Sequence, residues 1–146
     1  MRENEGASLK EDLTGKLAGL EKMLGQIEEI EPSVAEGYRA KLLAKLQELL
    51  ADTNIDEQRI LTEAAIFAEK TAIDEETVRL HSHITQFREL LGAEEPIGRK
   101  LDFLVQEMNR EVNTIGSKAQ ELRITRLVVD MKSEIEKIRE QIQNME

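Results

Sequence analysis

The residues best suited to chemistry gather in one predicted helix, which begins at the break formed by Pro96 and Gly98 and ends at Gly116. Within it, Glu107 and Glu111 are four residues apart, so an α-helix places their carboxylates on adjacent turns of one face. Carboxylates in this arrangement can hold Mg²⁺ or Mn²⁺ between helices. Acidic pairs at this spacing also occur on solvated helices, so a metal site and a solvated surface remain open alternatives.

A histidine adds a further group that phosphodiester cleavage could use. His83 lies near Leu80 and Phe87, at the margin of the apolar stripe of a helix predicted over 75–91, whereas His81 points elsewhere. A half-buried histidine either fills a core position or takes part in chemistry. At a metal site, the cation would activate water, the histidine would handle protons, and basic side chains would steady the phosphate. The candidates for this last role are Arg79, Arg99, Lys100, Arg110 and Lys118.

The same helix carries amides where a solvated helix would carry better helix formers. An asparagine inside a helix costs roughly 0.5 kcal/mol relative to alanine, which indicates a demand other than helix stability. That demand is either a functional site or a hydrogen-bond network that fixes register between helices or subunits. The residues on this flank of the apolar stripe are Asp102, Gln106, Asn109 and Asn113.

Apolar residues recur every three or four positions along the whole chain, and this pattern predicts an all-α fold. We expect one domain over residues 1–146, an elongated antiparallel bundle of about five to six helices. Pro32 and Ser33 are predicted to break the first pattern, so that residues 1–50 form a helical hairpin that protrudes from a bundle over 56–146. The bundle carries the motif block 76–118. The predicted helices span 8–31, 33–50, 56–70, 75–91, 98–116 and 124–146.

Composition restricts the class of protein. The chain has 146 residues, 3% aromatic residues, no cysteine and a formal net charge of −10. The core must therefore be aliphatic, and both disulfides and thiolate metal sites are excluded. The negative charge opposes non-specific attraction to RNA or anionic membranes, so any such binding must be local. The sequence shows neither a secretory leader nor a membrane span, which favours the cytoplasm.

Four segments together resemble the C-terminal half of the YicC-like family of bacterial endoribonucleases. They are the stretch 2–6, the motif Glu75-Glu76 followed by 79–83 and Gln86-Phe87, the block 98–118 and the ending 132–144. Members of that family are usually about twice as long as this chain and begin with a separate N-terminal domain, so the resemblance implies that the chain is a fragment. It also implies RNA cleavage with a divalent cation, Mn²⁺ or Mg²⁺. The implied partners are RNA, further copies in a ring-like homo-oligomer, a hexamer in the full-length protein, and polynucleotide phosphorylase in small-RNA turnover.

The resemblance assigns roles only to positions within the matching motifs. His83, Glu107 and Glu111 are the expected catalytic residues, and the expected metal ligands are Glu76, Asp102, Glu107 and Glu111. An alternative function is a non-catalytic oligomerisation or adaptor module of a larger RNA-processing protein. In the adaptor version, the amphipathic seam of residues 8–31 would be the docking face for a partner.

Overall fold

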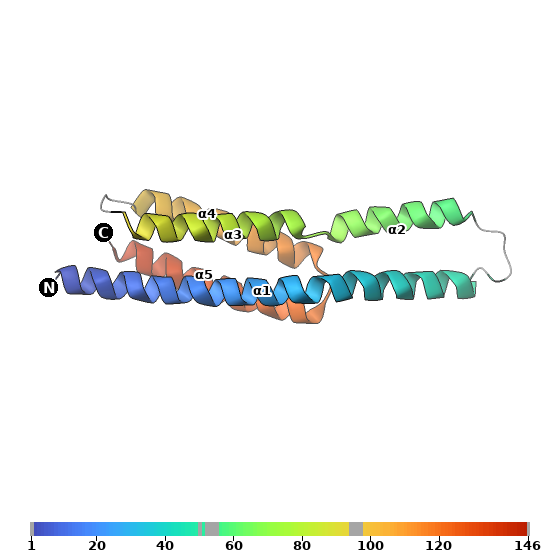
Figure 1. Ribbon diagram of the computed structural model, residues 1–146, viewed down its shortest axis with the longest axis horizontal. Helices are drawn as coiled ribbons and strands as arrows, with labels where there is room; N and C mark the ends of the chain where they lie inside the picture. Colours follow the sequence, from blue (N-terminus) through green and yellow to red (C-terminus); the bar gives the residue numbers. More distant parts are fainter. Residues whose placement is uncertain (1, 50, 52–55, 94–97, 146) are drawn as a thin grey trace.

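The computed structural model describes residues 2–49, 51, 56–93 and 98–145, and the part that it describes consists of α-helices without strands (Figure 1). This confirms the predicted all-α class and the elongated bundle. No helix within the described residues is both long enough and apolar enough to cross a membrane. The helices are α1 (Arg2–Leu49), α2 (Glu57–Thr71), α3 (Asp74–Leu91), α4 (Gly98–Lys118) and α5 (Leu122–Gln143).

Four helices form the bundle: the first part of α1 packs against α3 and α5, and α4 lies between α3 and α5. The core is almost wholly aliphatic, as the composition predicts, with Phe87 as its one aromatic residue among those described. The seam of α1 packs into this core, which corrects the expectation that residues 8–31 offer a docking face. Its buried members follow the spacing of a helical stripe and are Leu13, Leu17, Leu20, Leu24 and Ile27.

The predicted break at Pro32 is wrong, because α1 continues through it to Leu49. A proline inside a helix removes one backbone hydrogen bond and is expected to end or kink the helix. Here α1 is tied to the α3 region in the turn before that position: Glu28 pairs with His81, and Glu31 accepts from the backbone N–H of Ile73 at 3.5 Å. Packing against the bundle therefore outweighs the local penalty. Residues 2–49 are one helix, whereas a hairpin was predicted over residues 1–50.

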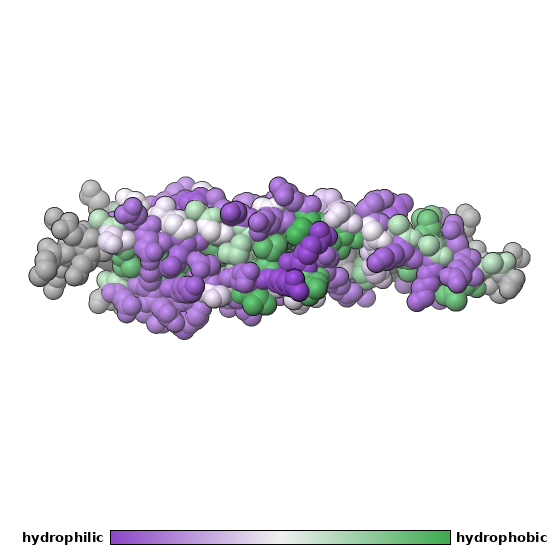
Figure 2. Space-filling view, turned by 90° about the horizontal axis from the view of Figure 1, so that it is seen from below, coloured by the Kyte–Doolittle hydropathy of each residue, from purple (hydrophilic) through white to green (hydrophobic). Residues whose placement is uncertain are grey.

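A two-helix arm does protrude from the bundle, but it is made by residues 33–49 of α1 together with α2 (Figure 1). Tyr38 and Phe67 stack across the arm with ring centroids 3.7 Å apart. The arm leaves large apolar side chains in water, among them Leu43 at 50% and Leu61 at 59% exposure. Figure 2 shows hydrophobic surface at this end and near the middle, whereas hydrophilic side chains dominate the rest of that face.

The ends of the bundle helices fix how α3, α4 and α5 meet. The helix α3 begins at Asp74, one residue before the predicted start, and its N-cap is Ile73. The helix α4 continues past Gly116, where an added Cβ would lie 3.0 Å from Val128 of α5. Glycine thus allows the close approach of α4 and α5. With its back packed on α5, α4 presents its other flank to α3.

Candidate metal centre

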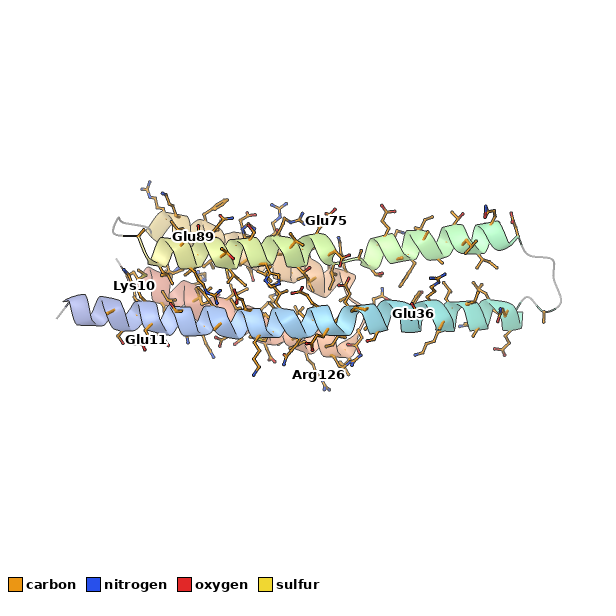
Figure 3. The ribbon with its side chains drawn as sticks, viewed as in Figure 1. Lys10, Glu11, Glu36, Glu75, Glu89 and Arg126 are labelled. Carbon is orange, nitrogen blue, oxygen red and sulfur yellow. The ribbon has the colours of Figure 1, made fainter. Side chains whose placement is uncertain are left out.

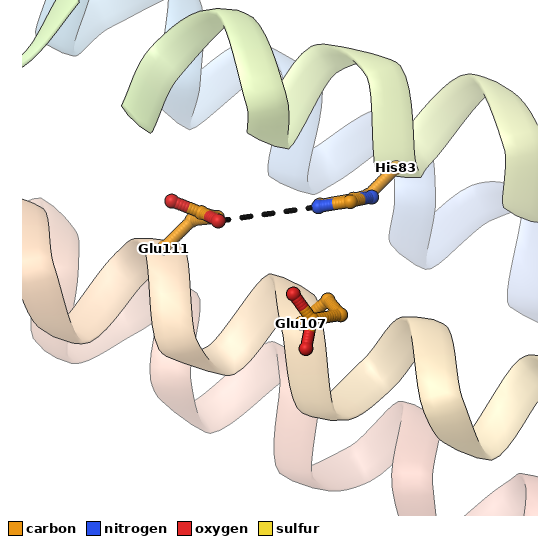
Figure 4. Close-up of side chains that lie close together, drawn as sticks. All are labelled: His83, Glu107 and Glu111. Atoms are coloured by element: carbon orange, nitrogen blue, oxygen red, sulfur yellow. Dashed lines mark ion pairs between the residues drawn. The ribbon is translucent and has the colours of Figure 1, made fainter. Parts of the chain in front are cut away.

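One histidine and two glutamates converge where α3 faces α4 (Figure 4). His83, Glu107 and Glu111 each offer one ligand atom, and these atoms all lie within 4.8 Å of one another. The Nε2 atom of His83 is 4.0 Å from Oε1 of Glu111. The two glutamates reach the same place because a spacing of four residues brings their side chains to one face of α4. The structure thus brings together the three expected catalytic residues.

The cluster is largely removed from solvent, and it contains polar atoms without partners. The side chain of His83 is 17% exposed and that of Glu111 is 6% exposed. Both ring nitrogens of His83 are buried and have no hydrogen-bond partner among the described residues. A buried polar atom without a partner is costly in free energy and calls for an explanation. Carboxylate oxygens with one imidazole nitrogen are a suitable donor set for Mn²⁺ and an acceptable one for Mg²⁺, so the residues present fit such a cation.

Arg79 connects the cluster to its surroundings. Its Nε donates to Oε2 of Glu111 at 3.2 Å, and its guanidinium also lies 3.5 Å from Glu76 and 3.6 Å from Glu75. The hydrogen bond to Glu111, aided by the neighbouring acids, raises the pKa of Arg79. A guanidinium held in this way fixes one oxygen of Glu111 while the other faces His83. The residue that the sequence suggested as a phosphate ligand therefore contacts carboxylates.

Glu76 is held by a second basic residue. Its Oε1 accepts from Nζ of Lys118 at 2.7 Å, and its side chain is only 3% exposed. Burial by itself would raise the pKa of Glu76, but the hydrogen bond and charge of Lys118, together with Arg79, lower it below the ordinary value. Glu76 lies outside the three-residue cluster. Its observed partner is Lys118, although its Oε2 remains buried without one among the described residues.

Comparison with known proteins identifies the family to which the chain belongs. Residues 27–146 match the sequence family described as "Endoribonuclease YicC-like, C-terminal". The chain belongs to the YicC-like endoribonuclease family. It is 52% identical over its whole length to the "Probable endoribonuclease YicC" of Clostridioides difficile, and 36% identical to the protein of the same name from Haemophilus influenzae. In both cases the chain spans 50% of the relative's length.

The remaining predicted residues of this YicC-like chain lie outside the cluster. Asp102 accepts a hydrogen bond from Gln106 at 3.2 Å and does not join His83, so it is not placed to bind the same ion. Among the described residues, this is the only side-chain hydrogen bond made by the predicted polar network. The side chains of Asn109 and Asn113 form no hydrogen bond with any described residue. The predicted phosphate ligands Arg99, Lys100 and Arg110 are exposed.

Two functional contacts were missed by sequence reasoning: the pairing of Arg79 with Glu111 and that of Glu76 with Lys118. Both depend on the antiparallel register of α3 and α4, which local spacing does not reveal. The sequence nevertheless held a signal for this register. Along α3 the acid Glu76 is followed by the base Arg79, and read backwards along α4 the base Lys118 is followed by the acid Glu111, so antiparallel packing can pair opposite charges. Once one contact is fixed, the others follow from that register.

Proposed function

We propose that this chain is the part of a YicC-like endoribonuclease that carries the cation used in RNA cleavage, held by His83, Glu107 and Glu111. One observation supports this proposal most strongly: three ligand atoms lie within 4.8 Å of one another, in a largely buried place where both nitrogens of His83 lack partners. The relatives are each named as a probable endoribonuclease, which supports RNA cleavage as the reaction class.

The position of each residue in the site indicates its role in the proposed reaction. A bound divalent cation supplies activation of water and compensation for the negative charge of the phosphodiester. Glu107 and Glu111 give carboxylate oxygens, and Arg79 keeps Glu111 oriented through its bond to Oε2. His83 directs Nε2 towards Glu111, so this nitrogen is the one placed to join the carboxylates as a ligand. Arg99, Lys100 and Arg110 are exposed and therefore accessible to the phosphates of RNA.

The first test is cation binding by the 146-residue chain itself, measured by titration with Mn²⁺ and detection of the unbound ion by electron paramagnetic resonance. We expect Glu107→Gln, Glu111→Gln and His83→Ala to weaken binding by at least about tenfold each. Glu140→Gln and His81→Ala are matched controls, because Glu140 is exposed on α5 and His81 pairs with Glu28 away from the cluster. Unchanged binding in all three cluster variants, with helicity retained, would remove the site assignment.

The second test is cleavage of a labelled structured RNA with Mn²⁺ or Mg²⁺ against EDTA. The proposal predicts cation-dependent cleavage that Glu107→Gln and Glu111→Gln abolish. The chain spans half of its curated relatives, so the same variants should be made in a protein of the relatives' full length as well. Cleavage that persists in both variants of the longer protein would contradict the proposal, whether or not this chain cuts RNA by itself.

A second candidate function, assembly, is favoured by the arm. Three leucines of the arm, Leu43, Leu49 and Leu61, are exposed by 50%, 66% and 59%, and a partner could cover such apolar side chains. Under this proposal the chain contributes to a homo-oligomer, and Leu43→Gln with Leu61→Gln lowers the mass measured by light scattering. An unchanged mass would count against it. A cytoplasmic location, small-RNA turnover and association with polynucleotide phosphorylase are parts of the proposal that the family resemblance supports.

A further inference from the structure

A shallow groove of about 530 Å³ continues the α3/α4 seam beyond the metal cluster. Its walls include Gln86 and Glu89 from α3, and Arg99, Lys100 and Phe103 from α4. Figure 3 shows where Glu89 lies on α3, near the end of the bundle that the groove occupies. The groove therefore combines one aromatic ring, two basic side chains and one carboxylate within a small area.

Phe103 is unusual among the few aromatic residues of this chain. The chain has three phenylalanines, one tyrosine and no tryptophan. Phe87 is fully buried and Phe67 is stacked on Tyr38, whereas Phe103 is 59% exposed. An exposed ring beside basic side chains is the combination with which proteins bind single-stranded nucleic acid, because the ring stacks on a base while the cations contact the phosphates.

The position of Phe103 relates the groove to the cluster. Phe103 precedes Glu107 by one helical turn, about 6 Å along α4, so the two side chains share a face. On the opposite helix, Gln86 follows His83 by nearly one turn, in the direction that antiparallel packing requires. A base on Phe103 and a phosphodiester at the cluster would thus belong to neighbouring nucleotides of one strand.

The charges around the ring of Phe103 also define the orientation of a bound nucleotide. Arg99 and Lys100 are exposed and form no ion pair with any residue that the structure describes, so they can contact a phosphate. Glu89 is exposed on the other wall, where a carboxylate repels phosphate and accepts from the amino group of a base. The phosphate side of a nucleotide is therefore directed to α4.

We infer that this groove is a nucleotide subsite for single-stranded RNA, in which one base stacks on Phe103 and its phosphate contacts Arg99 or Lys100. This inference rests on the proposed function, since it places the strand so that the next phosphodiester lies at the cation site. It adds a position where the substrate is held through base stacking, which tolerates different bases and disfavours paired ones.

The absence of tryptophan allows a direct test. In Phe103→Trp the introduced ring is the only tryptophan, and its fluorescence should be quenched when a short single-stranded oligoribonucleotide binds in EDTA, where no cleavage interferes. The same oligonucleotide in duplex form, or with abasic sites throughout, should not quench it. Val129→Trp is the matched control, because Val129 is 61% exposed on α5 and distant in sequence from the groove.

Affinity measurements separate stacking from charge. Phe103→Ala and Phe103→Leu should weaken binding of the single strand by roughly 5- to 150-fold, whereas Phe103→Tyr should restore it. Removing Arg99 and Lys100 together should lower the slope of log affinity against log salt concentration by about 0.7 for each lost phosphate contact. Mn²⁺ binding and helicity should be unchanged in the Phe103 variants, which would show that the fold is intact.

Three outcomes would overturn the inference: no quenching at Phe103→Trp, equal quenching at Val129→Trp, or equal quenching by duplex RNA. A change of assembly mass in Phe103→Ala without any change in RNA affinity would overturn it in favour of a protein contact. Failure of the subsite is distinguishable from failure of the proposed function. If the chain binds no cation but single-stranded RNA still quenches the fluorescence of Phe103→Trp, only the metal site is contradicted. If RNA is cleaved in a cation-dependent way but that fluorescence is not quenched, only the subsite is contradicted.

Discussion

Replacing Lys118 by methionine should destabilise the bundle, because Lys118 is the main partner of a carboxylate that is only 3% exposed. Removing one partner from a fully buried ion pair costs about 3–5 kcal/mol. Here Lys118 itself is 31% exposed, and Nη2 of Arg79 stays 3.5 Å from the same oxygen of Glu76. We therefore expect a smaller loss, about 1–2 kcal/mol in the free energy of unfolding at pH 7.

The same substitution should change how stability depends on pH. Burial acts to raise the pKa of Glu76, but Lys118 and Arg79 bring it below its ordinary value of 4.5. A carboxyl group whose pKa is lower in the folded protein adds stability above pH 4.5, and this stability is lost as the pH falls through the folded value. Since Lys118→Met removes the largest of the lowering influences, the variant should lose less stability on acidification.

Urea unfolding followed by circular dichroism at pH 7 and at pH 4 measures both effects. Lys137→Met is the control, because Lys137 is 57% exposed and its partner Glu134 is 24% exposed, so that this surface pair should contribute little. Equal free energies of unfolding for the two variants at pH 7 would refute the reasoning. Glu76→Gln should leave Mn²⁺ affinity close to that of the unaltered chain. A loss of Mn²⁺ affinity in this variant would restore Glu76 as a metal ligand.

Three further predictions concern α1 and its contact with α3. Glu31→Gln should stabilise the protein at pH 7 and reduce the fall in stability as pH rises above 4.5, because burial and the nearby Asp74 raise the pKa of Glu31; urea unfolding at several pH values checks this. Pro32→Ala should raise the free energy of unfolding by about 1–3 kcal/mol, since it restores a helical N–H donor. Leu20→Ala should cost about 2–5 kcal/mol and Leu43→Ala less than about 1, because Leu20 is fully buried and Leu43 is 50% exposed; thermal and urea unfolding compare them.

The fold was predictable where local spacing decides it. The stripe of Leu13, Leu17 and Leu20 repeats with the period of a helix, and this period requires a buried face whatever the neighbouring helices are. The continuity of α1 through Pro32 was not predictable, because a rule for proline describes one missing hydrogen bond and not the contacts of the flanking turns. The Glu28 to His81 contact that ties this region to α3 joins residues far apart in sequence.

The site divides in the same way. That Glu107 and Glu111 share a face follows from helix geometry alone, and that His83 lies at the edge of the core follows from its neighbours in sequence. That Arg79 bonds Glu111 depends on the register of two helices, which the spacing along either helix alone does not fix. Asp102, predicted as a further ligand, lies outside the cluster of His83, Glu107 and Glu111 and accepts a hydrogen bond from Gln106.

The register of α3 against α4 also explains why the proposed cation site lies at one point of the seam. From one end, Lys118 pairs with Glu76, and Arg79 then bonds Glu111, so each of these acids has a basic partner. At the next turn Glu107 meets His83, whose two nitrogens have no partner among the described residues. Two basic side chains thus face three carboxylates at the α3/α4 contact, and the uncompensated charge falls beside a donor nitrogen. A divalent cation at this point would balance the third carboxylate and give one nitrogen of His83 a partner.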